Sequence, residues 1–251
     1  PLYVAQHGKL TGFASEMRPL ARLFPVKVDR AALSELLIFR FAAGRLSNLT
    51  DIESLPGGTV LVQSLATGKQ HTYRFCDPLD SIDADPSIDM ETAIAQSREA
   101  IINAVHDHLA SDVGYTVQLS GGVDSSLVSA IAQRETGGAL ASYGGHIPGY
   151  DLDEAPYRAQ AVERIGLEHS EITLDGHAFA DALPRAVRHM EGPVPHYGCV
   201  MLMLLCDKIR ERSKVVLTGE GADELFGGYK RYDIWRDLAQ KGRLAKLVPG
   251  W

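Results

Sequence analysis

The fold is decided by a glycine- and serine-rich stretch, Ser120-Gly121-Gly122-Val123-Asp124-Ser125-Ser126. An apolar run at 115–119 precedes it and is predicted to be a strand, and a helical pattern begins at about Asp124. Glycines let a backbone come close to an oxyanion, and a helix N-terminus adds free N–H groups and the positive end of its dipole. The stretch therefore predicts a strand–loop–helix unit that binds phosphate.

Two common phosphate loops are excluded by their spacing. A Walker A loop needs G-x-x-x-x-G-K-[ST], and a dinucleotide loop needs G-x-G-x-x-G; the stretch fits neither. Asp124 would stand beside the phosphates, where Mg²⁺ usually takes a protein oxygen. The structural alternative is a plain Ser/Gly turn that caps a helix. In its strand–loop–helix context the stretch instead resembles the pyrophosphate-binding loop of the ATP-pyrophosphatase superfamily, which implies cleavage of ATP between its α- and β-phosphates.

The rest of the chain supports an α/β fold. After residue 89, apolar strands are predicted at 115–119, 139–145, 168–174 and 214–218, and helices of ten or more residues lie between them. Such alternation is typical of a parallel sheet with helices on both faces, whose ligands bind at the carboxyl ends of the strands. Residues 76–88, rich in Asp and Pro, are predicted to be a linker. Residues 1–75 would then form a separate α+β part, and 89–251 the nucleotide-binding domain.

A second glycine-rich loop follows the last predicted strand, with the sequence Thr218-Gly219-Glu220-Gly221-Ala222-Asp223-Glu224-Leu225-Phe226-Gly227-Gly228-Tyr229. Its three carboxylates repel one another unless a cation or a base compensates. An acid-rich helix start with a glycine stop is the structural alternative. Beside the first loop, however, the acids favour a metal–phosphate site that needs carboxylates on both sides.

This second loop resembles the signature of glutamine-hydrolysing asparagine synthetases. Asp153-Glu154-Ala155-Pro156-Tyr157 is similar to the family's next helix, and Phe13-Ala14-Ser15-Glu16 looks like one of the last strands of the family's N-terminal-nucleophile glutaminase domain. The resemblance implies that residues 1–75 are the end of that domain. It also implies an adenine-nucleotide α-hydrolase-like fold for 89–251, and that the chain is the central part of a longer protein.

The resemblance also implies roles for individual residues. The ATP phosphates would be held by Ser120, Gly121, Gly122, Ser125 and Ser126. Mg²⁺ would be bound by Asp124 and Asp223, and these two residues and Glu220 would form the catalytic set. The remaining nucleotide contacts would come from Leu119, Gly145, Thr218 and Gly219.

The implied activity is ATP-dependent amidation of a carboxylate through an acyl-adenylate, with aspartate, ammonia from glutamine and a homodimer as the expected partners. The segment 191–198 lies where the family recognises aspartate and matches it poorly; His196 there is either a substrate contact or a loop residue without a role. A related synthetase that forms a β-lactam or amidates a sugar acid is one alternative. A truncated domain that binds ATP without turnover is another. Residue 1 is proline, so the family's cysteine nucleophile is absent and glutamine hydrolysis is not expected.

Composition restricts the function further. The 251-residue chain carries a net charge of −7, which disfavours a general nucleic-acid binder. No apolar run is long enough to span a bilayer, so no membrane partner is expected. The three cysteines form no C-x-x-C pair, and a cytoplasmic location is predicted. Cys199 and Cys206, seven apart on an apolar helix, are expected to be core thiols.

Overall fold

The computed structural model describes residues 2–42, 47–77, 80, 82, 85, 87–138, 140–151 and 153–245. The chain divides into two compact units, and each is treated by itself. Unit 1 comprises residues 1–89 together with 176–203, and unit 2 comprises 90–175 together with 204–251. Residues 78, 79, 81, 83, 84 and 86 of the predicted linker, along with Ala139 at the start of a predicted strand, lie outside the described residues.

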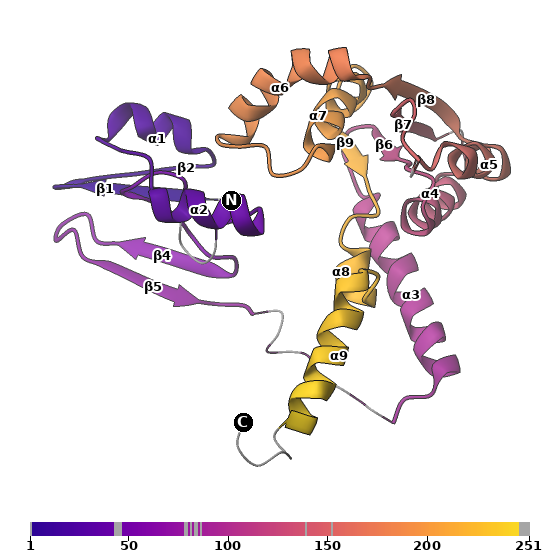
Figure 1. Cartoon of the computed structure of the whole chain (residues 1–251), viewed down its shortest axis with the longest axis horizontal. Helices are drawn as coiled ribbons and strands as arrows, with labels where there is room; N and C mark the ends of the chain where they lie inside the picture. Colours follow the sequence, from indigo (N-terminus) through magenta and orange to yellow (C-terminus); the bar gives the residue numbers. More distant parts are fainter. Residues whose placement is uncertain are drawn as a thin grey trace. The chain divides into compact units, whose positions relative to one another are not determined.

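Unit 1 is built from two small antiparallel sheets and short helices (Figure 1). One sheet has the order β2–β1–β3, and the other is a β4–β5 hairpin. Their strands are β1 (Tyr3–His7), β2 (Leu10–Ala14), β3 (Ile52–Ser54), β4 (Thr59–Gln63) and β5 (Gln70–Arg74). The helices are α1 (Met17–Leu23), α2 (Arg30–Phe39), α6 (Gly176–Met190) and the first half of α7 (Gly198–Ile209).

Helix α1 receives its N-terminal acceptor from a residue far along the chain. The Glu191 carboxylate accepts the backbone N–H of Met17 at 2.6 Å and of Arg18 at 2.7 Å. A helix start leaves its first N–H groups without helical partners, and a carboxylate there also meets the positive end of the dipole. Glu191 holds a positive φ of 55°, and its side chain is 7% exposed. Residues after 175 thus complete the packing of unit 1.

Unit 2 contains a four-stranded sheet in the order β8–β7–β6–β9, and every neighbouring pair is parallel. The strands are β6 (Tyr115–Gln118), β7 (Ala141–His146), β8 (Glu168–Thr173) and β9 (Val215–Leu217). The helices are α3 (Met90–His108), α4 (Val123–Thr136), α5 (Ala155–Ile165), α8 (Ala222–Phe226) and α9 (Lys230–Ala245). The parallel sheet flanked by helices confirms the predicted fold class. Chain order runs outward from β6 to β8 and then returns to β9 on the other side of β6.

The core of unit 2 explains why these strands are apolar. Val117 and Leu119 are fully buried and pack with residues of α3, α4 and β9. A parallel strand is covered on both faces, so continuous hydrophobic residues are expected there. The ends of α4 and α5 are set by Gly137 and Gly166, which adopt left-handed conformations that few other residues accept.

One sequence prediction needs correction. Cys206 is exposed and Cys199 is only partly buried, so the prediction of two core thiols was wrong. Residues 198–206 of α7 are all glycine or apolar, so spacing alone could not tell its buried residues from its exposed ones. Among the residues that the structure describes, no helix is both long and apolar enough to cross a bilayer.

Candidate nucleotide site

The two predicted loops meet at one edge of the sheet. They follow β6 and β9, which are hydrogen-bonded neighbours, and both leave from the carboxyl ends of those strands. Because β7 and β9 lie on opposite sides of β6, this is the point where the strand order reverses and where such sheets form their ligand crevice. Gly219 lies so close to the first loop that an added Cβ would stand 2.7 Å from the Ser125 nitrogen.

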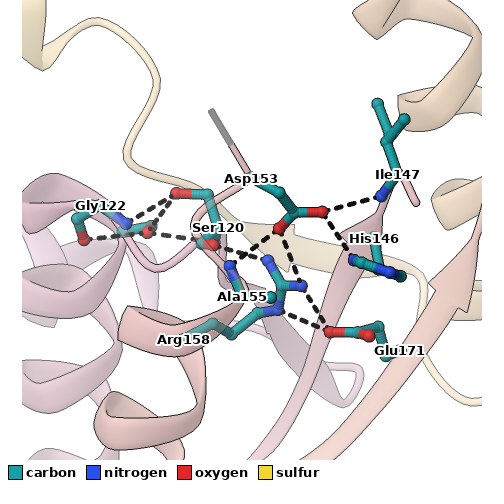
Figure 2. Close-up of polar contacts among 9 residues, drawn as sticks. Ser120, Gly122, His146, Ile147, Asp153, Ala155, Arg158 and Glu171 are labelled. Carbon is teal, nitrogen blue, oxygen red and sulfur yellow. Dashed lines mark hydrogen bonds and ion pairs between the residues drawn. The ribbon is translucent and has the colours of Figure 1, made fainter. Parts of the chain in front are cut away.

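The first loop is braced by its own serines (Figure 2). The Ser120 hydroxyl accepts the N–H of Gly122 at 3.1 Å and lies 3.0 Å from the Ser125 hydroxyl. The Ser125 hydroxyl also accepts the N–H of Ser120 at 3.2 Å. Helix α4 starts after Gly122, so the N–H groups of Val123, Asp124 and Ser125 have no acceptor within the helix. The loop thus presents backbone donors at a helix N-terminus.

A cavity of about 230 Å³ lies between the loops. Five carboxylates line it, those of Asp124, Glu154, Glu220, Asp223 and Glu224, together with backbone and hydroxyl groups of Ser120, Gly122, Ser125, Thr218 and Gly219. No lysine or arginine is among the described residues that line it. Backbone N–H donors suit an anionic ligand, but the five carboxylates around them would repel it. The cavity therefore favours an anionic ligand that is bound together with a cation.

The donor set fits Mg²⁺ that is shared with phosphate. Within the described part of the chain, no three His, Cys, Asp or Glu side chains are placed to hold a metal ion by themselves. Mg²⁺ in nucleotide sites typically takes one or two carboxylates and fills its other positions with water and phosphate oxygens. Asp124 and Asp223, which come from the two loops, are carboxylates of this kind, and both line the cavity.

Tyr229 closes one side of the cavity. Its hydroxyl donates to the Glu224 carboxylate at 2.9 Å, and this bond, with burial and the nearby acids, raises the pKa of Tyr229. The Arg231 guanidinium lies 4.0 Å from the centroid of the Tyr229 ring. The tyrosine is therefore held between an acid and a cation as part of the cavity wall.

Behind the first loop lies a buried arginine, Arg158 of α5 (Figure 2). It donates through Nη1 to the Ser120 carbonyl at 2.7 Å and through Nε to Glu171 at 2.8 Å. Asp153 lies 3.6 Å from it and also accepts from His146 at 2.7 Å. Burial opposes ionisation of Asp153, but backbone N–H donors, His146 and the charge of Arg158 together lower its pKa.

The structure brings most of the predicted site residues to this cavity. Its lining includes Ser120, Gly122, Asp124, Ser125, Thr218, Gly219, Glu220 and Asp223. Gly121 and Ser126 lie on the outer side of the loop, facing α5. Leu119 is fully buried in the core, and neither it nor Gly145 lines the cavity.

The sequence did not single out Glu154, Arg158, Glu171 or Tyr229 as site residues. Arg158 and Glu171 look like ordinary surface charges on a helix and a strand. The signal that could have revealed Arg158 is Gly144, since a glycine inside a strand often marks a close approach by another group. An added Cβ there would lie 2.6 Å from the Arg158 Cδ.

His196 belongs to unit 1 and is engaged locally. Its Nδ1 accepts the N–H of Gly198 at 3.1 Å, and its ring lies 4.2 Å from the Tyr197 ring, measured between centroids. These contacts fix the turn that precedes α7.

Fold and site together define an α/β protein with an acidic cavity, lined in part by glycines, at the switch point of a parallel sheet. Residues 96–248 match the family model of asparagine synthase. The chain belongs to the asparagine synthase family.

Similar proteins support the same family. The chain is 25% identical over 236 residues to asparagine synthetase [glutamine-hydrolyzing] 1 of Bacillus subtilis, covering 92% of this chain and 36% of that protein. It is 32% identical to asparagine synthetase B of Escherichia coli over 71% of this chain and 34% of that protein. Amidase chyE of Penicillium rubens is 26% identical over 71% of this chain and 29% of its own length. The chain thus spans about a third of the length of these relatives.

Proposed function

We propose that this chain is the ATP-binding part of a ligase that activates a carboxylate and amidates it. The observation that carries the proposal is the meeting of two loops from β6 and β9, which sets backbone donors of α4 opposite a group of carboxylates. This arrangement suits the triphosphate of ATP accompanied by Mg²⁺. Family membership supports the same chemistry, because the matched relatives include asparagine synthetases.

The proposed reaction has two steps. An oxygen of the substrate carboxylate attacks the α-phosphorus, the bond to the bridging oxygen breaks, and pyrophosphate leaves with its electron pair. Ammonia then attacks the acyl carbon, AMP leaves and the amide loses a proton. Donors of the first loop would stabilise charge on the phosphates. Asp124 and Asp223 would hold Mg²⁺, and Glu220, exposed at the cavity, is placed to assist activation.

Aspartate is the proposed acceptor, with asparagine as the product and ammonia derived from glutamine in the whole protein. We also propose that residues 1–75 are the end of a glutaminase-type domain. The second candidate is a related synthetase that acts on another carboxylate. It is favoured by the similarity to an enzyme named as an amidase and by the departure of residues 191–198 from the family's aspartate segment.

The first test is Mg²⁺–ATP binding by isothermal titration calorimetry. Asp124→Ala and Asp223→Ala should each weaken binding by tenfold or more, roughly the effect of losing one or two charge-assisted ligands. Asp112→Ala is the matched control, because this exposed aspartate lies on the turn before β6 and does not line the cavity. Binding that is equal in all four proteins would contradict the metal assignment.

Turnover is the second test. Pyrophosphate release from Mg²⁺–ATP is measured with ammonium present, with and without aspartate. Aspartate-dependent release with asparagine formed supports the leading proposal. Release that depends on another carboxylate favours the second candidate, and binding without release identifies a nucleotide-binding domain without turnover of its own.

A further inference from the structure

Arg158 is charged, yet its side chain is only 3% exposed. Arginine is rarely buried without partners, because removing its charge from water is costly. Here Glu171 accepts from both Nε and Nη2, and Asp153 lies within ion-pair distance. Two carboxylates thus flank the single cation. Such burial also keeps the guanidinium from contacting a ligand, and its role must be exerted through its protein partners.

The partner that links Arg158 to the first loop is the Ser120 carbonyl (Figure 2). Nη1 donates to this oxygen at 2.7 Å, and the donor is charged. In a trans peptide the C=O and the next N–H point in opposite directions, and the described chain has no cis bond. Fixing the Ser120 carbonyl on Arg158 therefore directs the Gly121 N–H away from α5.

Two glycines make room for this arrangement. Gly121 has φ +109°, and an added Cβ would lie 2.6 Å from the Glu154 carbonyl oxygen and 2.7 Å from the Arg158 nitrogen. The loop therefore rests directly on the first turn of α5. Gly144 leaves open the part of β7 that the Arg158 side chain crosses. The sheet, α5 and the loop are thus joined through one side chain.

We propose that Arg158 is a positioning residue that sets the backbone of the first loop at Ser120, a residue that lines the cavity, for phosphate binding. This inference rests on the proposed function, because it assumes that ATP phosphates bind at the first loop. The geometry of the first loop then depends on α5, a helix later in the chain, and not on the glycines alone. An arginine that merely stabilised α5 would not need its bond to Ser120.

The test compares Arg158→Met with Arg212→Met in the 251-residue chain. Arg212 also forms a two-bond pair, with Glu168 at 2.6 and 2.7 Å, but at the amino end of β8 and exposed to solvent. Mg²⁺–ATP affinity is measured by calorimetry below the unfolding temperature of each protein. Arg158→Met should bind about 10- to 100-fold more weakly, as expected when a group that orients a ligand-binding group is lost. Arg212→Met should bind like the unsubstituted chain.

A second variant separates positioning from general stability. Arg158→Ala leaves a space that methylguanidinium can enter, so millimolar methylguanidinium should restore ATP affinity at least tenfold in this variant and leave Arg212→Ala unchanged. Arg158→Lys keeps the charge but lacks the forked donors, and should bind as weakly as Arg158→Met. If Arg158→Met does not fold, the test is made with Arg158→Ala and Arg158→Lys.

The outcomes are distinct. Failure of the unsubstituted chain to bind Mg²⁺–ATP overturns the proposed function and this inference with it. Binding by the unsubstituted chain, with folded Arg158 variants within threefold of it, overturns the inference and leaves the proposed function intact. Weak binding that methylguanidinium does not restore shows a structural role only, and also overturns it.

Discussion

Gly121→Ala tests whether the first loop rests on α5 as closely as the structure shows. A non-glycine residue at a strongly positive φ costs about 1–3 kcal/mol. The new methyl group would also meet two backbone atoms at 2.6 and 2.7 Å, and backbone cannot rotate away as a side chain can. Overpacking of this kind adds about 1–3 kcal/mol. We therefore expect a loss of roughly 2–6 kcal/mol in the free energy of unfolding.

Gly137→Ala is the matched control for this substitution. Gly137 ends α4 with a φ of +61°, and an added Cβ would have no atom within 4 Å. Its cost is limited to the left-handed conformation, about 1–2 kcal/mol. Urea unfolding followed by circular dichroism measures both variants, and calorimetry measures Mg²⁺–ATP affinity. If Gly121→Ala is no less stable than Gly137→Ala and binds ATP normally, the close approach of loop and helix is refuted.

Two further predictions concern pH and the packing of unit 1. Burial and the charge of Arg158 lower the pKa of His169, with Glu171 opposing them. At a pH between the two pKa values, the unfolded chain therefore binds a proton at His169 and the folded chain does not. Stability should therefore fall as pH drops below about 6.5, and His169→Gln should flatten that part of the urea-midpoint curve; an unchanged slope contradicts the assignment. Glu191→Ala removes the acceptor of two N–H groups of α1 and should cost about 1–2 kcal/mol. Glu16→Ala, an exposed partner of Arg18, is its control, and equal thermal shifts in the two variants would refute the capping role.

The sequence predicted most of the fold because its signals are local. The alternation of apolar strands and helices predicted the parallel sheet. The start of α2 is likewise set locally, because Asp29 accepts the backbone N–H groups of the two residues Ala31 and Ala32. Helix α1 was not predicted, because its N-terminal acceptor is Glu191, 174 residues from Met17. No local pattern records a partner at that distance.

The site residues likewise divide into those that local sequence motifs predict and those that they do not. Residue types and spacing were sufficient to find the two loops, since chemistry there depends on short motifs. Arg158 was not found because its partners are 13 and 38 residues away and its sequence context is that of an ordinary amphipathic helix. Only the folded sheet shows that this charge lies inside the protein.

The fit between Gly144 and Arg158 also bears on how the sequence can change over time. A larger residue at 144 meets the arginine side chain, and a smaller one at 158 leaves an empty space beside a bare strand. Substitutions at neighbouring positions of this kind are not additive. Arg158 therefore requires glycine at 144. A smaller residue at 158 would not by itself admit a side chain at 144, because the Leu119 carbonyl oxygen lies 2.8 Å from an added Cβ there. We expect an arginine at position 158 to be accompanied by glycine at position 144 among close homologues.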